Sequence, residues 1–232
     1  MNRNSAPGPD GFGPSFYTAA WQTVTDAVME FLGAFHNEVI QLAQVNRSYM
    51  ILLPKTLDAT SVTAFRPICL QNCCVKILAK ILTTQLQAQI KSLVDLDRTG
   101  FIKGRSITEN FVYATELVQY YHKRKLPTLV IKLDFAKAFD TVNWDALDLV
   151  LQTRGFSDKW RRWIMCILQS SHSVVLVNGV PGPWTNCRRG LRQGDPMSPY
   201  LFILVADVLQ MLIRADIEIR HLILQNAGCP VL

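Results

Sequence analysis

Two long apolar stripes with the three-and-four residue spacing of an amphipathic helix dominate this sequence of 232 residues. The first occupies residues 74–93, and the second occupies residues 197–212, with Pro196 and Pro199 in or near its first turn. Further stretches with the same spacing predict helices over residues 17–35, 107–121, 144–152 and 159–169. The chain is therefore expected to contain several packed helices.

Short apolar runs between these stretches predict strands. Tyr49–Leu53 is stopped by a proline, and Ile68–Leu70 follows another proline. Ser173–Val177 and Trp184–Arg188 flank an Asn-Gly-Val-Pro-Gly-Pro turn, which indicates a hairpin. Leu129–Leu133 is apolar apart from one lysine, as expected for a strand that is covered on both faces.

The composition favours a folded chain with a polyanionic partner. With 49% hydrophobic residues in 26.2 kDa, the chain can bury a core as one or two domains, which excludes disorder for most of it. Twenty-four Lys and Arg residues stand against 18 Asp and Glu residues, and this excess favours nucleic acid as a partner. The six cysteines lack the spacing of a metal site, so reduced core thiols are expected.

No export or membrane-spanning segment is expected. The N-terminal residues MNRNSAPGPDGFG form turns where a signal peptide has an apolar run. The most apolar stretch, Tyr200–Ile213, is interrupted by Asp207 and Gln210 and is shorter than the roughly 20 residues of a membrane span. A membrane is therefore not expected among the partners.

The segment VIKLDFAKAFDTVNW carries the first candidate for chemistry. Asp134 lies at the end of the expected strand, and Asp140 follows after a short linker. Catalytic Mg²⁺ prefers oxygen ligands from one or two carboxylates and from substrate phosphates, and Asp134 with the backbone carbonyl of Phe135 can supply such ligands. The alternative is that Asp134 caps the following turn, and spacing alone favours that alternative.

The segment GLRQGDPMSPYLF carries the second candidate. Arg192 and Gln193 lie beside a glycine in a turn before a helix, where donors can approach a phosphate or a base closely. The alternative is that glycine, aspartate and proline simply start the helix. Arg188 and Arg189 add charge to the same short segment and favour contact with phosphate.

Taken in order, these segments resemble the successive motifs of the reverse transcriptase domain of non-long-terminal-repeat retrotransposons, most closely those of plant genomes. SAPGPDGF resembles the N-terminal extension motif, FRPICLQNCCVKILAKIL the first finger motif, and GFIKGRSITEN the second. KLDFAKAFDTVNW resembles the palm motif with the first metal-binding aspartate, and GLRQGDPMSPYLF the following motif, which lines the incoming nucleotide. The resemblance spans nearly the whole chain.

The resemblance implies an α+β fold of the right-hand polymerase type, with helices on a small antiparallel sheet. Residues 1–126 would form the N-terminal extension and fingers, and residues 127–232 a partial palm without a thumb. The implied partners are an RNA template, a DNA primer and deoxynucleoside triphosphates. Localisation stays open between nucleus and cytoplasm, and the oligomeric state is not predicted.

The resemblance also implies roles for individual residues. Asp134 would bind both Mg²⁺ ions, with the carbonyl of Phe135 as a further ligand, and Phe139 would reject a ribose 2′-hydroxyl. Asp140 resembles a motif residue but need not touch metal. The remaining candidates are Gln193 and Arg66 for the nucleotide, and Lys103, Arg105 and Arg192 for nucleic acid.

The implied reaction is two-metal nucleotidyl transfer, which requires more than one carboxylate. The family supplies the others from a Tyr/Phe-Ala-Asp-Asp turn, and these 232 residues contain no Asp-Asp pair. We therefore expect no polymerisation by this chain alone, and we expect the strand before Asp134 to lack its neighbours and expose an apolar face. Two alternatives are an RNA- or DNA-binding module without catalysis, and a nuclease that uses Asp134, Asp140 and Asp145.

Overall fold

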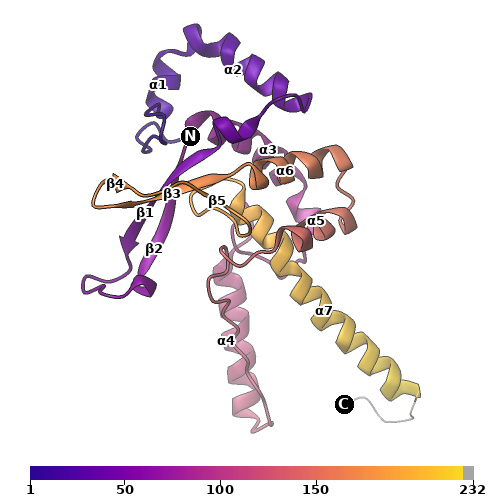
Figure 1. Ribbon diagram of the computed structural model, residues 1–232. Coiled ribbons are helices and arrows are strands. Elements are labelled where there is room, and N and C mark those ends of the chain that lie inside the picture. Colours follow the sequence, from indigo (N-terminus) through magenta and orange to yellow (C-terminus); the bar gives the residue numbers. More distant parts are fainter. Residues whose placement is uncertain (227–232) are drawn as a thin grey trace.

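The structure is a computed structural model that describes residues 1–226, and it has an α+β fold (Figure 1). The first half of the chain forms α1 (Pro14–Ala19), α2 (Trp21–His36), β1 (Arg47–Pro54), β2 (Phe65–Gln71), α3 (Cys73–Leu93) and α4 (Ile107–Lys123). The second half forms α5 (Trp144–Thr153), α6 (Asp158–Gln169), β3 (His172–Val177), β4 (Val180–Pro181), β5 (Thr185–Asn186) and α7 (Ser198–Asn226).

The strands form one mixed sheet in the order β2-β1-β3-β4, and β5 also pairs with β3. β1 and β2 make an antiparallel hairpin, and β3 pairs antiparallel with β4 and β5. β1 and β3 run parallel, so the expectation of a purely antiparallel sheet is wrong. The helices α3 to α6 lie between these two strands in the sequence and supply the long crossover that parallel pairing needs.

One hydrophobic core joins the helices to one another. It draws on α3, α5, α6 and the first half of α7, where Leu147, Leu151, Ile164 and Leu204 have no exposed surface. We call the sheet and these helical segments the body. The core contains residues from both sides of position 126, and the boundary predicted there stays a prediction.

Most expected elements are confirmed, with two differences among the helices. The single helix expected over residues 17–35 is divided at Ala20 into α1 and α2. The last helix is longer than expected, and its residues Ser198–Asp216 are long and apolar enough to cross a membrane by length and composition, contrary to the expectation. A third of this segment is buried in the body, and the core helix of a folded protein meets the same criteria.

The expected strand Leu129–Leu133 is absent, and this prediction is wrong. Residues 127–135 have no regular secondary structure, and among the described residues no backbone hydrogen bond has its donor in residues 127–136. A strand needs a neighbour for its backbone groups, and the described chain places none beside this segment. Its apolar side chains are exposed, as expected for a segment without neighbours, with Leu129 at 82% and Ile131 at 69%.

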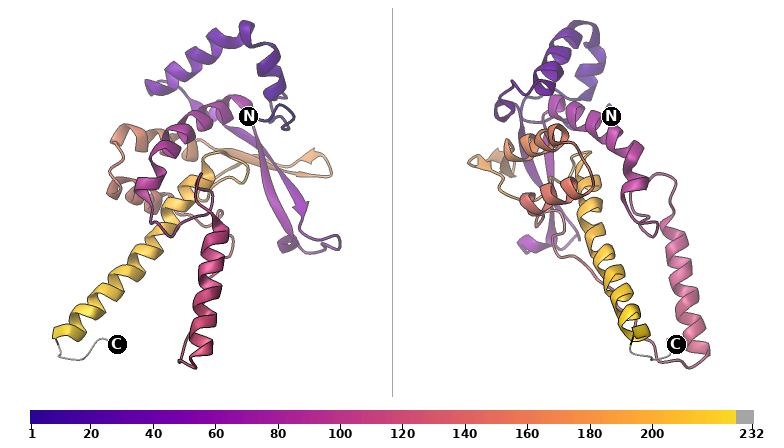
Figure 2. Two further views of the ribbon diagram at one scale, coloured as in Figure 1. Left: turned by 180° about the vertical axis from the view of Figure 1, so that it is seen from behind. Right: turned by 90° about the vertical axis from the view of Figure 1, so that its right-hand side faces the viewer.

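The helix before this segment is equally uncovered. α4 has no buried residue, and it projects from the body on the same side as the distal part of α7 (Figures 1 and 2). Residues 124–136 return from the tip of α4 to the body. We call α4 and residues 124–136 the arm.

Candidate functional site

The turn that carries Gln193 is bound to the residues that follow Asp134. The Gly190 amide donates to the carbonyl of Val142 at 2.8 Å, and the Leu191 amide donates to the carbonyl of Phe139 at 2.7 Å. Gly190 has a φ of +83°, and a Cβ there would lie 2.8 Å from the carbonyl oxygen of Asp140. Glycine is therefore required for this close approach.

The other side of the same turn is bound to the edge of the sheet. The amide of Cys69 in β2 donates to the carbonyl of Gln193 at 2.8 Å. Gly194 has a φ of +108°, and a Cβ there would lie 3.0 Å from the carbonyl oxygen of Cys69. The segments FRPIC, AFDTV and GLRQGD, which are far apart in the sequence, therefore meet at one place.

These segments surround a cavity of about 260 Å³. The Gln193 side-chain amide donates to Asp140 Oδ1 at 3.3 Å, and both residues line the cavity. Deeper in the protein, the amide of Gln71 donates to Asp195 Oδ2 at 3.0 Å. The lining combines apolar side chains with polar and charged ones, which could orient a ligand.

The two phenylalanines near Asp134 contact the start of α7. The ring of Phe139 stacks on Phe202 with centroids 5.1 Å apart, and Phe135 meets the same ring edge-on at 6.4 Å. Phe139 is half-buried, while Phe135 is 51% exposed. The Phe139 ring therefore contacts a side chain that packs against the core.

Asp134 is exposed in the irregular segment. Among the described residues, no three His, Cys, Asp or Glu side chains lie close enough together to hold a metal ion. The residues present therefore do not complete a site for Mg²⁺, although Asp134 and the carbonyl of Phe135 are ligands of the right chemistry. The nuclease alternative has no support, because Asp134, Asp140 and Asp145 do not form such a group.

Arg192 is half-buried and is bound within the protein, and its predicted contact with nucleic acid stays a prediction. Its Nη1 donates to Asn46 Oδ1 at 2.6 Å and its Nη2 to the Asn46 carbonyl at 3.3 Å. Asn46 is fully buried, and its amide donates to the carbonyl of Ile167 at 2.7 Å. Burial lowers the pKa of Arg192 below its ordinary value. The residue thus ties the turn to the start of β1.

Arg105 has a structural role as well, and its predicted contact with the template stays a prediction. Its guanidinium donates to the carbonyls of Lys91, Asp95 and Arg98, with 3.1 Å to Lys91 and 2.7 Å to Arg98. These carbonyls lie at or just beyond the C-terminal end of α3, where helical carbonyls lack partners. Lys103 is exposed nearby and remains available for a ligand.

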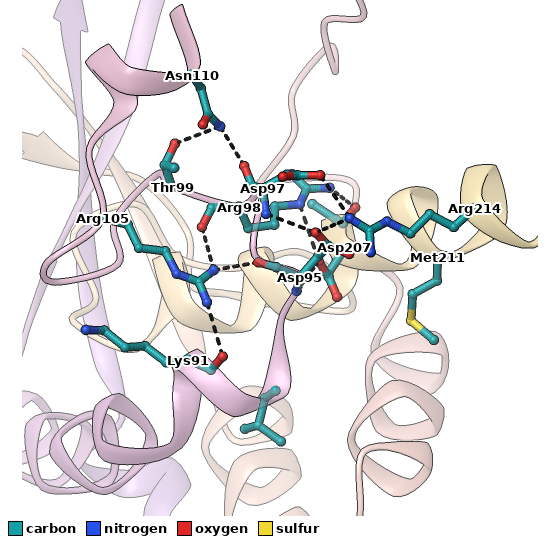
Figure 3. A network of polar contacts seen from close by, with 12 residues as sticks. Lys91, Asp95, Asp97, Arg98, Thr99, Arg105, Asn110, Asp207, Met211 and Arg214 are labelled. Carbon is teal, nitrogen blue, oxygen red and sulfur yellow. Dashed lines mark hydrogen bonds and ion pairs between the residues drawn. The ribbon is translucent and has the colours of Figure 1, made fainter. Parts of the chain in front are cut away.

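A buried aspartate on α7 organises the same region (Figure 3). Asp207 is 1% exposed, and it pairs with Arg154 at 2.5 Å. It also pairs with Arg98 at 3.6 Å. Arg214, one of the next polar residues along α7, binds Asp95 and Asp97 at 2.9 Å each. The sequence offered one signal for this cluster, a charged residue inside the apolar stripe of a helix. This cluster of ion pairs holds the connection between α3 and α4 against α7.

A second group of arginines has no such partners. Among the described residues, no hydrogen bond or ion pair engages the exposed guanidinium groups of Arg47, Arg66, Arg188 and Arg189. Arg47 and Arg66 lie on strands of the sheet, and Arg188 and Arg189 lie in the irregular segment between β5 and the Gln193 turn. Arg189 lines the cavity, whereas Arg47 and Arg66 lie on the opposite face of the sheet from the cavity-lining residues of β1 and β2. An anionic ligand is attracted to such unpaired cations without the need to break an existing ion pair.

The sequence of the chain matches a known protein family. The family model described as reverse transcriptase (RNA-dependent DNA polymerase) matches residues 53–224. The chain is 27% identical over 215 residues to a 149 kDa protein of transposon TX1 from Xenopus laevis, covering 92% of this chain and 16% of that protein. It is 26% identical over 211 residues to the Pol polyprotein of retrotransposable element R2 from Nasonia vitripennis, covering 89% and 20%.

A third relative is the Pol polyprotein of element R2DM from Drosophila melanogaster, which is 26% identical over 219 residues, covering 94% of this chain and 20% of that protein. The chain thus spans a fifth or less of the length of these curated relatives. The family model covers most of the chain. The chain therefore belongs to the reverse transcriptase family, as a domain of the kind found in the Pol proteins of non-long-terminal-repeat retrotransposons.

Proposed function

We propose that the chain supplies the fingers and the first part of the palm of an RNA-directed DNA polymerase. The observation that carries this proposal is the Gln193 turn, which is hydrogen-bonded to Phe139 and Val142 on one side and to Cys69 on the other. This turn brings the segments expected to hold triphosphate, metal and nucleotide to one place. The partners would be an RNA template, a DNA primer and deoxynucleoside triphosphates.

The proposed roles divide between recognition and metal binding. Gln193 would position the nucleotide with its side-chain amide, whose orientation is set by the 3.3 Å contact with Asp140. Arg66 would bind the triphosphate, and Lys103 the template, because both cations are exposed and unpaired among the described residues. Phe139 would exclude a ribose 2′-hydroxyl, and its stacking on Phe202 supports the ring from one side.

Asp134 and the carbonyl of Phe135 would contribute ligands to the divalent cation, which the resemblance identifies as Mg²⁺. One carboxylate does not hold two metal ions, so catalysis would need carboxylates from residues other than those described. We therefore propose no catalytic step for these residues alone.

The test is a chimera in which this chain replaces the matching segment of the Drosophila R2DM protein, to which it aligns over 219 residues. The chimera should extend a DNA primer on an RNA template. Asp134→Asn should abolish extension without weakening primer–template binding, whereas Asp145→Asn, at an exposed position on α5, should leave extension unchanged. A chimera that binds the primer–template but never extends it, or that extends it equally well with Asp134→Asn, would contradict the proposal.

The unpaired arginines favour a second function, binding of nucleic acid without catalysis. The 232-residue chain alone should bind a primer–template with an affinity that falls as salt rises, because each phosphate contact releases counterions. Arg188→Ala should reduce the slope of this dependence by about one. Arg162→Ala is the matched control, because Arg162 is 58% exposed but pairs with Glu38 at 3.1 Å. Equal slopes for all three proteins would exclude a phosphate contact at Arg188.

A further inference from the structure

The cavity beside the Gln193 turn is lined by two side chains whose hydrogen bonding is incomplete. Gln71 Oε1 and Arg192 Nε are buried and have no hydrogen-bond partner among the described residues, and both residues line the cavity. Gln71 points to the cavity together with Pro67 and Cys69, because the three alternate along β2. Gln71 is 0% exposed, so bulk water does not reach its side chain. Buried polar atoms almost always have a partner, so two without one at the same cavity indicate a binding site.

The rest of each side chain is held, so the two atoms are fixed in place. The Gln71 amide nitrogen donates to Asp195 Oδ2 at 3.0 Å. A rotated Gln71 amide would bring its carbonyl oxygen against this carboxylate, which only accepts hydrogen bonds, so Oε1 remains the end without a partner. Both Nη atoms of Arg192 donate to Asn46, which leaves Nε. The Cys187 thiol beside this guanidinium is only a weak acceptor.

The size and the charge of the cavity suit a small neutral molecule. Its volume of about 260 Å³ far exceeds the roughly 10–15 Å³ that one water molecule needs. Its charged lining residues balance, since Arg189 and Arg192 stand against Asp140 and Asp195, and a neutral ligand is therefore favoured over an ion. Four lining residues carry sulfur, which packs favourably against aromatic rings: Met50, Cys69, Cys187 and Met197.

The proposed contacts with a nucleotide do not account for these two atoms. Among the described residues that would hold the nucleotide, Gln193 lines the cavity, whereas Arg66, Phe135 and Phe139 do not. Gln193 contacts Asp140, and no contact joins it to Gln71 Oε1. Filling the cavity is therefore distinct from holding the nucleotide.

We propose that the cavity binds a small uncharged aromatic amide, whose N–H donates to Gln71 Oε1 and whose carbonyl oxygen accepts from Arg192 Nε. An amide carries its donor and its acceptor on separate atoms, and the two atoms that need partners lie on separate segments, β2 and the Gln193 turn. A carboxylate has no donor for Gln71, and an ammonium group has no acceptor for Arg192. This goes beyond the proposed function, because the ligand is neither a nucleotide nor a nucleic acid and requires neither Asp134 nor a metal ion.

The experiment compares three probes of nearly the same shape, benzamide, benzoate and benzylamine, by calorimetric titration of the 232-residue chain. Benzamide should bind with a Kd of about 1 mM, as expected for a ligand of this size. Benzoate and benzylamine should bind about tenfold more weakly, because each leaves one buried polar atom without a partner. The comparison uses the parent protein alone, so it does not depend on the folding of a variant.

Two further measurements locate the site. Benzamide at roughly ten times its Kd should slow the reaction of Cys187 with methyl methanethiosulfonate about tenfold, because Cys187 lines the cavity. Cys166 on α6, which is also half-buried but does not line the cavity, is the internal control and should react at an unchanged rate. Gln71→Met removes the carbonyl oxygen and should weaken benzamide binding about tenfold. Gln152→Met, at an exposed position on α5, is the matched control and should not affect binding.

The proposal is overturned if benzamide does not bind, which would mean that water completes the two side chains, or if all three probes bind equally. It is also overturned if benzamide protects Cys166 as much as Cys187, or if a folded Gln71→Met binds benzamide as the parent does. Because none of these readouts involves a nucleotide or primer extension, a chimera that fails to polymerise leaves this proposal standing.

Discussion

The body and the arm each contain an apolar run of five residues, and only the run in the body is a strand. Tyr49–Leu53 lies within β1, where every residue of the run pairs with β2, and Tyr49 and Met50 also pair with β3. Leu129–Leu133 in the arm has no neighbouring strand among the described residues and remains irregular. An apolar run therefore forms a strand only where a neighbouring strand pairs with its backbone N–H and C=O groups.

The helices of the two regions make the same contrast. α3 in the body buries eight residues, whereas α4 in the arm buries none although it carries an apolar stripe of its own. Phe111 at 72% and Tyr113 at 66% are among its exposed side chains. The arm is therefore shaped by local sequence alone, while the body is shaped by packing.

Hydrogen exchange should show the largest difference between the two regions. Backbone amides of residues 127–136 have no backbone acceptor among the described residues, so they should exchange at nearly the rate of an unstructured peptide. Amides of β1 should exchange only when the body opens, at a free-energy cost approaching global stability, about 5–15 kcal/mol in typical domains. Exchange followed by peptide mass spectrometry measures both. Strong protection of residues 127–136 would break the comparison and reveal a partner for the arm.

Asp207→Ala should be the most damaging single substitution in the body. It leaves the Arg154 guanidinium, whose side chain is only 16% exposed, without its anion, and breaking a buried ion pair in this way costs about 3–5 kcal/mol. Urea unfolding measures the loss. The matched control is Asp158→Ala on α6, which removes an 81% exposed partner of Arg161 and should change stability by no more than about 0.5 kcal/mol. Equal losses would mean that burial does not decide the effect.

Replacing a leucine by alanine should lower the free energy of unfolding in the body but not in the arm, because only the body leucine is packed. Leu204→Ala in the body removes a side chain with no exposed surface and should cost about 2–5 kcal/mol. Leu129→Ala in the arm removes an 82% exposed side chain and should cost less than about 0.5 kcal/mol. The same unfolding experiment compares the two. A large loss from Leu129→Ala would show that the arm packs against something in solution.

The elements of the body were predictable because their signals are local. Helical spacing located α3, α5, α6 and α7. The Asn-Gly pair marked the turn after β3, where Asn178 and Gly179 both have positive φ, but β4 lies inside the stretch that was expected to be turn. The parallel pairing of β1 with β3 was not predictable, because those strands are more than 100 residues apart and nothing in either run specifies direction. The wrong prediction of a strand at Leu129–Leu133 has the same cause, because the sequence of a segment does not show whether another strand lies beside it in the fold.

For the candidate site, the sequence identified the segments that take part but not the surroundings of each side chain. Order and composition of the motifs identified the segments that meet at the Gln193 turn. The sequence did not show which arginines are bound inside the protein, because this depends on which carbonyl groups the fold places beside each guanidinium group. Arg192 and Arg105 are held by buried or helix-end carbonyls, whereas Arg66 stays free, yet all three lie within two residues of a proline or glycine in the sequence.

The smallest effect should come from a surface ion pair of the body, which tests whether charge adds anything to packing there. Arg161 binds Asp148 through two contacts, at 2.9 and 2.5 Å, and this hydrogen bonding lowers the pKa of the Asp148 carboxyl. A lowered pKa in the folded state means that the pair stabilises the protein above the unfolded value, about 3.9, and that this contribution disappears as pH falls through the folded value.

Asp148→Asn should therefore unfold slightly more easily than the parent at pH 7, with a smaller loss than either Asp207→Ala or Leu204→Ala. The gap should narrow once the pH drops below about 4 and close at lower pH, because the parent carboxyl is then protonated as well. Thermal unfolding across this range measures it. A gap that persists in strong acid would assign the effect to shape instead of charge, and no gap at pH 7 would mean that packing alone holds α5 against α6.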